Sequence, residues 1–227
     1  MPYFDLRTEG TVNLLTMLNG ENENTLTTPV LEEFLTHIET LESIPGQQAL
    51  VLSSNHPKYW CLGMNLNWFV TQTAEELTHF ITLLEEMLMR VAWLNMPTVA
   101  CLTGHCYGAG AILACAFDFR VMRADRGRFC VSAINQKMPI SGLLIDVVKL
   151  LPNAHTVHEL LLTGKALGGE ECLPRNVVDA IYPAEQLESA AIQLANELAE
   201  KDRHTYTTIK RGLRRQLADC PRMQPAT

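Results

Sequence analysis

Apolar positions along the chain recur with two periods, which predict strands alternating with helices. Short, wholly apolar runs are typical of buried strands, whereas apolar residues every three or four positions are typical of amphipathic helices. Because the two patterns alternate over much of the chain, they predict an α/β fold. The predicted strands are residues 12–18, 49–52, 98–102, 118–122 and 129–132, and the predicted helices are residues 28–41, 75–94, 111–116, 142–151, 154–162 and 184–200.

Local signals place some of the boundaries between these elements. Thr28 is expected to be the N-cap of the first helix, with Pro29 at the first helical position. Pro97 is expected to stop the helix before it. From residue 154 onward the pattern is helical, so we expect a core formed by residues 1–152 and a helical C-terminal part formed by residues 153–227.

Composition narrows the class of protein. Of the 227 residues, 47% are apolar, enough for a substantial core, and the net charge of −7 argues against a nucleic-acid partner. No apolar run is long enough to span a membrane, the first residues do not resemble a signal peptide, and the last do not resemble a peroxisomal address. The seven cysteines lie mostly in apolar runs without zinc-site spacing, so we expect a reducing, cytoplasmic location and no metal.

A glycine-rich turn at residues 104–110 follows the predicted strand 98–102. Glycines let a backbone approach a ligand, and the free N–H groups at a helix start favour negative charge. The turn is therefore suited to a phosphate, to an oxyanion that develops during a reaction, or simply to close packing of a helix on a sheet. A dinucleotide site fits poorly, because Leu113 replaces the third glycine and residues 133–134 carry no acid.

A second glycine turn follows the predicted strand 49–52. Gly63 lies in the segment Tyr59–Leu66, again just beyond a buried strand. Two such turns at adjacent strand ends can aim two backbone N–H groups at one point, which is the geometry of an oxyanion hole.

These motifs together resemble the crotonase superfamily, the enoyl-CoA hydratase/isomerase group. Residues 60–66 (WCLGMNL) are similar to the family's FSAGxDL motif, and residues 104–110 (GHCYGAG) to its NGxAxGGG motif. Asp118 and Arg120 match a following DxR, and residues 161–179 resemble the family's LLTG and LV stretch. The resemblance covers residues 3–215, and it is strongest to the short enoyl-CoA delta-isomerases.

The resemblance implies a spiral of ββα turns with a helical C-terminal part used in trimerisation. It implies an acyl-CoA thioester as substrate, no other cofactor, and a homotrimer or homohexamer. The backbone N–H groups of Met64 and Ala109 would form the oxyanion hole. The residues implied in coenzyme A binding are Cys61, Leu62, Gly108, Lys210, Arg211, Arg214 and Arg215, although the four cations are also typical of a solvated helix face.

The chain departs from the family at both acid/base positions. Ile112 and Ala133 stand where hydratases carry glutamates, and the isomerases use the second of these for proton transfer. Candidate substitutes are Asp146, Glu85 and Asn135, of which Asn135 cannot titrate and could only orient water. His105 is expected to hydrogen-bond within its turn.

Two functions therefore remain open. One is an acyl-CoA enzyme that stabilises an enolate and most resembles an alkene isomerase. The other is a protein that binds acyl-CoA without turnover. A carboxylate within reach of the substrate's α-carbon would favour the enzyme. A cavity lined at that point only by Ile112, Ala133 and Asn135 would favour the binding protein.

Overall fold

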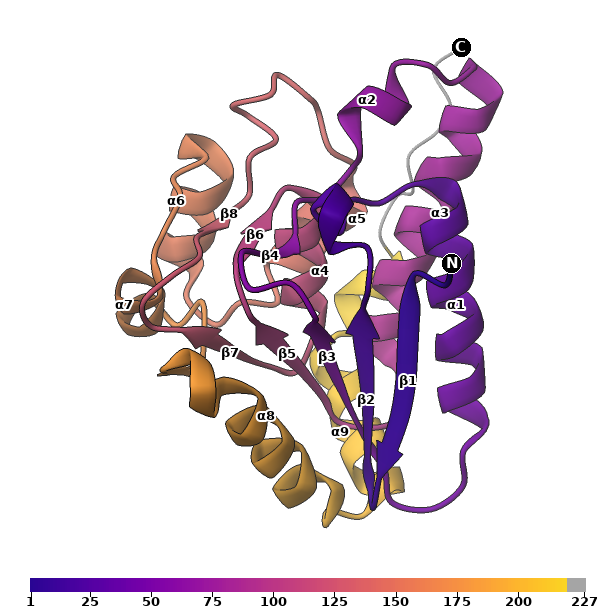
Figure 1. Ribbon diagram of the computed structural model, residues 1–227, viewed down its shortest axis with the longest axis vertical. Coiled ribbons are helices and arrows are strands. Elements are labelled where there is room, and N and C mark those ends of the chain that lie inside the picture. The colour runs from indigo at the N-terminus through magenta and orange to yellow at the C-terminus, as the bar shows by residue number, and fades with distance from the viewer. Residues whose placement is uncertain (220–227) are drawn as a thin grey trace.

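The computed structural model describes residues 1–219, in which one six-stranded sheet forms the centre (Figure 1). The strand order is β1-β2-β3-β5-β7-β9, and every pair is parallel except β1 with β2. A smaller parallel sheet has the order β4-β6-β8. The strands are β1 (Phe4–Glu9), β2 (Val12–Met17), β3 (Ala49–Ser54), β4 (Tyr59–Cys61), β5 (Thr98–Leu102), β6 (His105–Tyr107), β7 (Phe119–Arg123), β8 (Phe129–Cys130) and β9 (Ala180–Tyr182).

Helices cover both faces of the main sheet. Figure 1 shows α1 and α3 side by side on one side of the strands and α8 along the other. All six residues of β3 are buried for this reason. The α-helices are α1 (Thr28–Ser43), α2 (Leu66–Phe69), α3 (Ala74–Trp93), α4 (Ala109–Ala116), α5 (Gly142–Val148), α6 (Ala154–Thr163), α7 (Gly169–Cys172), α8 (Ala184–Ala199) and α9 (Arg203–Leu213), with 3-10 turns η1 (Gly20–Asn22), η2 (Leu173–Arg175) and η3 (Arg215–Asp219).

Several helix boundaries have clear local causes. α3 begins with a capping box, in which Thr73 and Glu76 satisfy each other's backbone N–H groups. α1 begins at Thr28, so its N-cap is Thr27 rather than the predicted Thr28, and Thr27 makes no side-chain cap. Pro29 still lies in the first turn of the helix, where a missing N–H costs nothing.

The region after residue 154 is not wholly helical, which corrects the prediction. β9 lies in this region and pairs with β7, which extends the main sheet. α8 then packs across the sheet, where Leu187, Ala191 and Ala195 are buried. The boundary between residues 152 and 153 stays a prediction, and the part after it contributes β9 to the main sheet.

The last helix is tied to the core by a buried ionic cluster around Asp118. Lys210 and Arg214 both reach this carboxylate, at 2.9 Å and 2.8 Å. Tyr206 donates a hydrogen bond to it at 3.1 Å, and the backbone N–H of Thr98 does so at 2.9 Å. The cluster thus links α9 to the start of β5 and to the residue that precedes β7.

Candidate functional site

A cavity of about 1210 Å³ lies beyond the carboxyl ends of β3 and β5. Parallel strands end at the same edge of a sheet, so the loops that follow them meet there. The cavity is lined by the loop before α1, the segment that joins β4 to α2, one face of α3, the start of α4 and the segment before α5. Met64, Ala109, Ile112 and Ala133 all line it, so the structure brings together the four positions that the motifs single out.

Gly63 holds the two glycine turns against each other. Its φ of +81° favours glycine, and a Cβ there would lie 2.7 Å from the backbone nitrogen of Ala109 and 2.9 Å from the carbonyl oxygen of Tyr107. No side chain fits in that space. The absence of a side chain at residue 63 therefore allows the segment with Met64 to lie directly beside the start of α4.

The backbone N–H of Met64 points away from the segment that contains Leu26, with which Met64 forms a parallel bridge. Leu26 donates to the carbonyl of Gly63 at 2.8 Å and accepts from the N–H of Asn65 at 3.0 Å. In this parallel bridge Leu26 is hydrogen-bonded to the two residues that flank Met64, Gly63 and Asn65. The N–H of Met64 itself therefore faces away from Leu26. Met64 also lines the cavity, so its N–H is placed to serve a ligand there.

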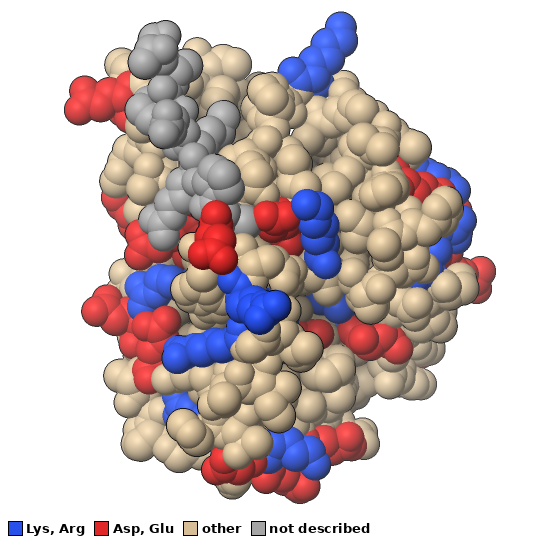
Figure 2. Space-filling model, turned by 180° about the vertical axis from the view of Figure 1, so that it is seen from behind, with Lys and Arg blue, Asp and Glu red and all other residues tan. Residues whose placement is uncertain are grey.

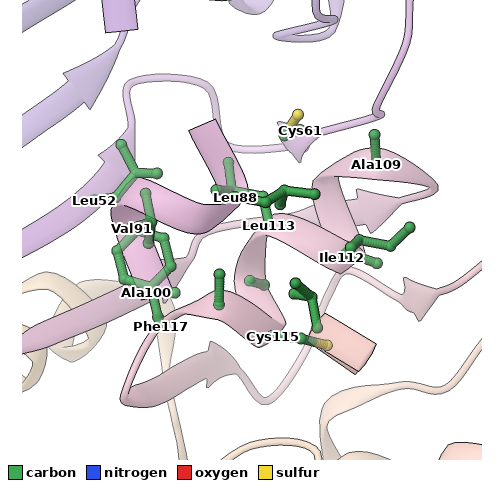
Figure 3. Packing of buried hydrophobic residues seen from close by; sticks show 14 of the residues in the cluster. Leu52, Cys61, Leu88, Val91, Ala100, Ala109, Ile112, Leu113, Cys115 and Phe117 are labelled. Atoms are coloured by element: carbon green, nitrogen blue, oxygen red, sulfur yellow. The ribbon is translucent and has the colours of Figure 1, made fainter. Parts of the chain in front are cut away.

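Ala109 supplies the second N–H because it is the first residue of α4. The first N–H groups of a helix have no partner within the helix, and the helix dipole makes this end attractive to negative charge. Figure 3 shows Ala109 at the start of α4, with Cys61 on the neighbouring segment. A Cβ at Gly110 would lie 2.3 Å from the carbonyl oxygen of Cys61, so small residues are needed for this close approach.

The two acid/base positions of the family present only hydrocarbon to the cavity. Ile112 lies one turn into α4 and is 2% exposed (Figure 3). Ala133 lies on the segment between β8 and α5 and contributes a methyl group. Neither side chain can donate, accept or carry a proton.

None of the three predicted substitutes lines the cavity. Glu85 is buried in α3, where its neighbour Leu84 reaches the cavity instead. Asp146 pairs with Lys149 at 2.7 Å, and Asn135 donates to the carbonyl oxygen of Gly164 at 2.8 Å. The structure does not place these three residues among those that line the cavity, so their role as replacement acid/base groups stays a prediction. Between residues 1 and 219, the carboxylates that do line the cavity are Glu21 and Glu23.

Those two glutamates lie near the end of the cavity that the resemblance assigns to coenzyme A. The carbonyl of Glu23 accepts a hydrogen bond from the N–H of Leu62 at 3.2 Å. Leu62 and Gly108 line the cavity and Cys61 does not, and the contacts of all three with coenzyme A stay a prediction. Burial raises the pKa of Cys61 to about 12, so this thiol is neutral at physiological pH.

The predicted coenzyme A contacts in and just after α9 need correction. Lys210 and Arg214 are 4% and 8% exposed and are held by Asp118, so they form neither a phosphate site nor a solvated face. A charge pattern cannot reveal which face of a helix packs on a buried carboxylate. Arg211 and Arg215 are exposed and remain available to a ligand.

Two lysines and a tyrosine that the sequence motifs did not single out also line the cavity. These lysines are Lys58 and Lys137. Lys58 immediately precedes the Tyr59–Leu66 segment, and this position in the sequence could have indicated that it lies at the site. Tyr107 also lines the cavity, and burial raises the pKa of its hydroxyl group.

His105 differs from its expected role. It lines the cavity, but its Nδ1 atom is buried without a hydrogen-bond partner, so this atom does not fix the turn. Partial burial, with the positive charges of Lys58, Arg126 and Arg128, lowers the pKa of His105. The imidazole is therefore neutral at physiological pH.

Known proteins are similar to this chain in sequence and in fold. Residues 7–225 match the family described as enoyl-CoA hydratase/isomerase. Enoyl-CoA delta isomerase 3 of Arabidopsis thaliana is 29% identical over 92% of this chain and 90% of its own length. Hydroxycinnamoyl-CoA hydratase-lyase of Pseudomonas fluorescens is 28% identical over 86% of this chain and 72% of its length. The crystal structure of a probable enoyl-CoA hydratase from Mycobacterium tuberculosis has a TM-score of 0.89 at 20% identity and covers 96% of this chain and 90% of the other.

The fold and the site therefore define a crotonase-type acyl-CoA protein. The chain belongs to the enoyl-CoA hydratase/isomerase family, and it is similar to the enoyl-CoA delta isomerases within it. Within residues 1–219, no helix combines the length and apolar character needed to cross a bilayer. The same residues contain no group of three His, Cys, Asp or Glu side chains arranged to hold a metal ion.

Proposed function

We propose that the 1210 Å³ cavity binds an acyl-CoA thioester and polarises its carbonyl through the backbone N–H groups of Met64 and Ala109. The observation that carries this proposal is the contact of Gly63 with the backbone of Ala109. It supports the proposal because Met64 and Ala109 then lie on adjacent segments that line one cavity. Such donors stabilise an oxyanion more strongly than in water because they are already oriented and partly shielded.

The same cavity lacks a carboxylate at the positions that move protons in the family. Each positioned acid or base contributes about 10²–10⁴ in rate. We therefore propose that the protein binds and polarises the thioester without hydrating it at an ordinary enzymatic rate. Incubation with crotonyl-CoA, followed by mass spectrometry, is expected to show no appreciable addition of water. Rapid hydration would contradict the assignment of Ile112 and Ala133.

Double-bond isomerisation is the second candidate, because three of the curated relatives are enoyl-CoA delta isomerases of Arabidopsis thaliana. In this reaction a proton leaves C2 of a 3-enoyl thioester and returns to C4, and the oxyanion hole holds the intervening dienolate. The neutral imidazole of His105 is one group in the cavity able to accept a proton. Conversion of 3-hexenoyl-CoA to its conjugated isomer, lost on His105→Phe, would establish this activity.

Binding is the direct test of the main proposal. Purified protein is titrated with butanoyl-CoA and, separately, with free coenzyme A. Butanoyl-CoA cannot isomerise, so its affinity reports binding alone. We expect tighter binding of butanoyl-CoA than of coenzyme A, because only the thioester offers a carbonyl to Met64 and Ala109. Equal affinities, or no binding of either compound, would overturn the proposal.

A further inference from the structure

A second cavity of about 890 Å³ lies beside the first. It is bordered by the segment of residues 133–140, by α5 and by α6. Ala133, Lys137, Met138, Pro139 and Ile140 line both cavities, so the segment is a shared wall. The two cavities therefore adjoin each other along this segment.

Ala133 is the smallest side chain in that shared wall. It lies at the position where the family resemblance puts a glutamate, facing the substrate next to the carbonyl. Replacing a glutamate with a methyl group removes a charge and opens space at the boundary between the cavities. The residue that stands in place of the base is therefore also the smallest side chain between the two cavities.

The chemistry of the second cavity favours a hydrocarbon. Its walls are formed mainly by aliphatic side chains, including Ile145, Val157 and Leu161. Ile134 and Leu162 also line it and are 48% and 68% exposed, which is high for large apolar side chains. Between residues 1 and 219 no carboxylate lines the cavity, and Lys149 at its rim is paired with Asp146.

We propose that the second cavity receives the distal part of a long acyl chain whose thioester is held in the first. This inference rests on the proposed function and adds the substrate class, long-chain rather than short-chain acyl-CoA. Its physical consequence is a dependence of affinity on chain length. Each additional buried methylene increases affinity by up to about fourfold.

The test compares saturated acyl-CoA thioesters of increasing length. Dissociation constants are measured for butanoyl-, octanoyl-, dodecanoyl- and hexadecanoyl-CoA, each below the concentration at which it forms micelles. We expect affinity to rise steadily and to continue rising beyond octanoyl-CoA. If butanoyl-CoA binds and longer chains gain nothing, this inference fails while the proposed function stands. If no thioester binds, the proposed function itself fails.

A matched pair of variants tests whether the acyl chain of the thioester lies in the second cavity. Ala154 is the exposed first residue of α6 and lines only the second cavity, so Ala154→Phe fills that cavity without touching the first. Ala184 is the exposed first residue of α8 and lines neither cavity, so Ala184→Phe is the control. We expect Ala154→Phe to lower the affinity for hexadecanoyl-CoA at least tenfold and to leave butanoyl-CoA unchanged. Ala184→Phe is expected to behave as the unmodified protein.

A second copy of this chain is the competing occupant of the second cavity. Light scattering coupled to size-exclusion chromatography measures the molecular mass of the assembly and so distinguishes a second copy from an acyl chain. If Ala154→Phe lowers the molecular mass of the assembly and does not alter the chain-length dependence, the cavity is an interface between copies and the inference is overturned. An unchanged mass with lost long-chain affinity supports the acyl-chain assignment.

Discussion

The Nζ atom of Lys210 lies 2.9 Å from Oδ2 of Asp118, and the two side chains are 3% and 8% exposed. Lys210 also donates to the carbonyl oxygen of Met96 at 3.0 Å. A buried lysine is stabilised only when its charge is paired and its protons find acceptors, and both conditions hold here. The contact connects the last helix to the start of β5, one of the strands that lead into the site.

Removal of the Asp118 charge is expected to destabilise the protein strongly. In Asp118→Asn, Lys210 and Arg214 would be buried without a counter-charge, which costs about 3–5 kcal/mol of the free energy of unfolding. Urea denaturation measures this quantity. The control is Asp125→Asn, which breaks a 2.6 Å pair with Arg123 at the surface, where ion pairs contribute little. Such surface pairs are common because, on the face shown in Figure 2, Lys and Arg side chains are interspersed with Asp and Glu side chains. Similar losses in both variants would contradict a special role for Asp118.

The Lys210 ammonium group should also make stability depend on pH. Burial lowers the pKa of Lys210 to about 8, against the opposing effect of Asp118. The unfolded chain keeps a lysine pKa of about 10.4. Between these values the unfolded chain holds a proton that the folded protein has released, so the contribution of this group to the free energy of unfolding rises with pH.

The comparison is between the unmodified protein and Lys210→Met, each denatured in urea across this pH range. The free energy of unfolding of the unmodified protein minus that of the variant should become more positive as the pH rises from about 8 toward 10. A constant or falling difference would show that Lys210 keeps an ordinary pKa in the folded state.

Gly63→Ala should impair recognition of the thioester carbonyl. The new Cβ would meet the Ala109 nitrogen at 2.7 Å, which forces the two N–H donors apart. If each hydrogen bond is worth about 1 kcal/mol, losing both lowers the affinity for butanoyl-CoA, relative to free coenzyme A, by about tenfold or more. Gly46→Ala is the matched control, because Gly46 has a φ of +80° but nothing within 4 Å of a new Cβ. Both variants bear the same backbone strain, so equal affinity in the two would exclude the proposed carbonyl site.

Ala133→Glu should introduce proton-transfer chemistry. The new carboxylate would face the cavity beside Ile112, where desolvation raises its pKa toward the range useful for a base. We expect isomerisation of 3-hexenoyl-CoA, followed by absorbance of the conjugated product, to increase by about 10²–10⁴. The control Asn135→Glu adds the same charge outside the cavity lining. If Ala133→Glu binds butanoyl-CoA but is no faster than this control, residue 133 is not at the proton-transfer position.

Much of the sheet could be predicted from the sequence because its strands are buried on both faces. The apolar runs in β3 and β5 are continuous, and α3 differs from its prediction by one residue at each end. β1 was missed because only Phe4 of its six residues is buried, so the strand is held by backbone pairing with β2 rather than by apolar burial. β9 has three residues, too few for a periodic signal.

The site was predictable where it depends on local backbone and not where it depends on packing. Gly63 and Gly108 have positive φ values, and such positions are visible in a sequence as glycine. The partners of Glu85 and Asp146 depend on which way a helix turns its faces, which charge spacing does not determine. The same limit explains why Lys210 was mistaken for a surface cation.

The carbonyl-binding groups proposed here belong to the main chain, so they do not depend on the identity of residues 64 and 109. Any residue except proline at either position retains its N–H. The side chains at 112 and 133, in contrast, determine whether an acid or a base faces the cavity, and they do not supply the two N–H groups. Point substitutions at 112 and 133 can thus change the reaction while substrate recognition by the main chain is kept. A chain built this way can lose or exchange its catalytic step and remain a receptor for the same compounds.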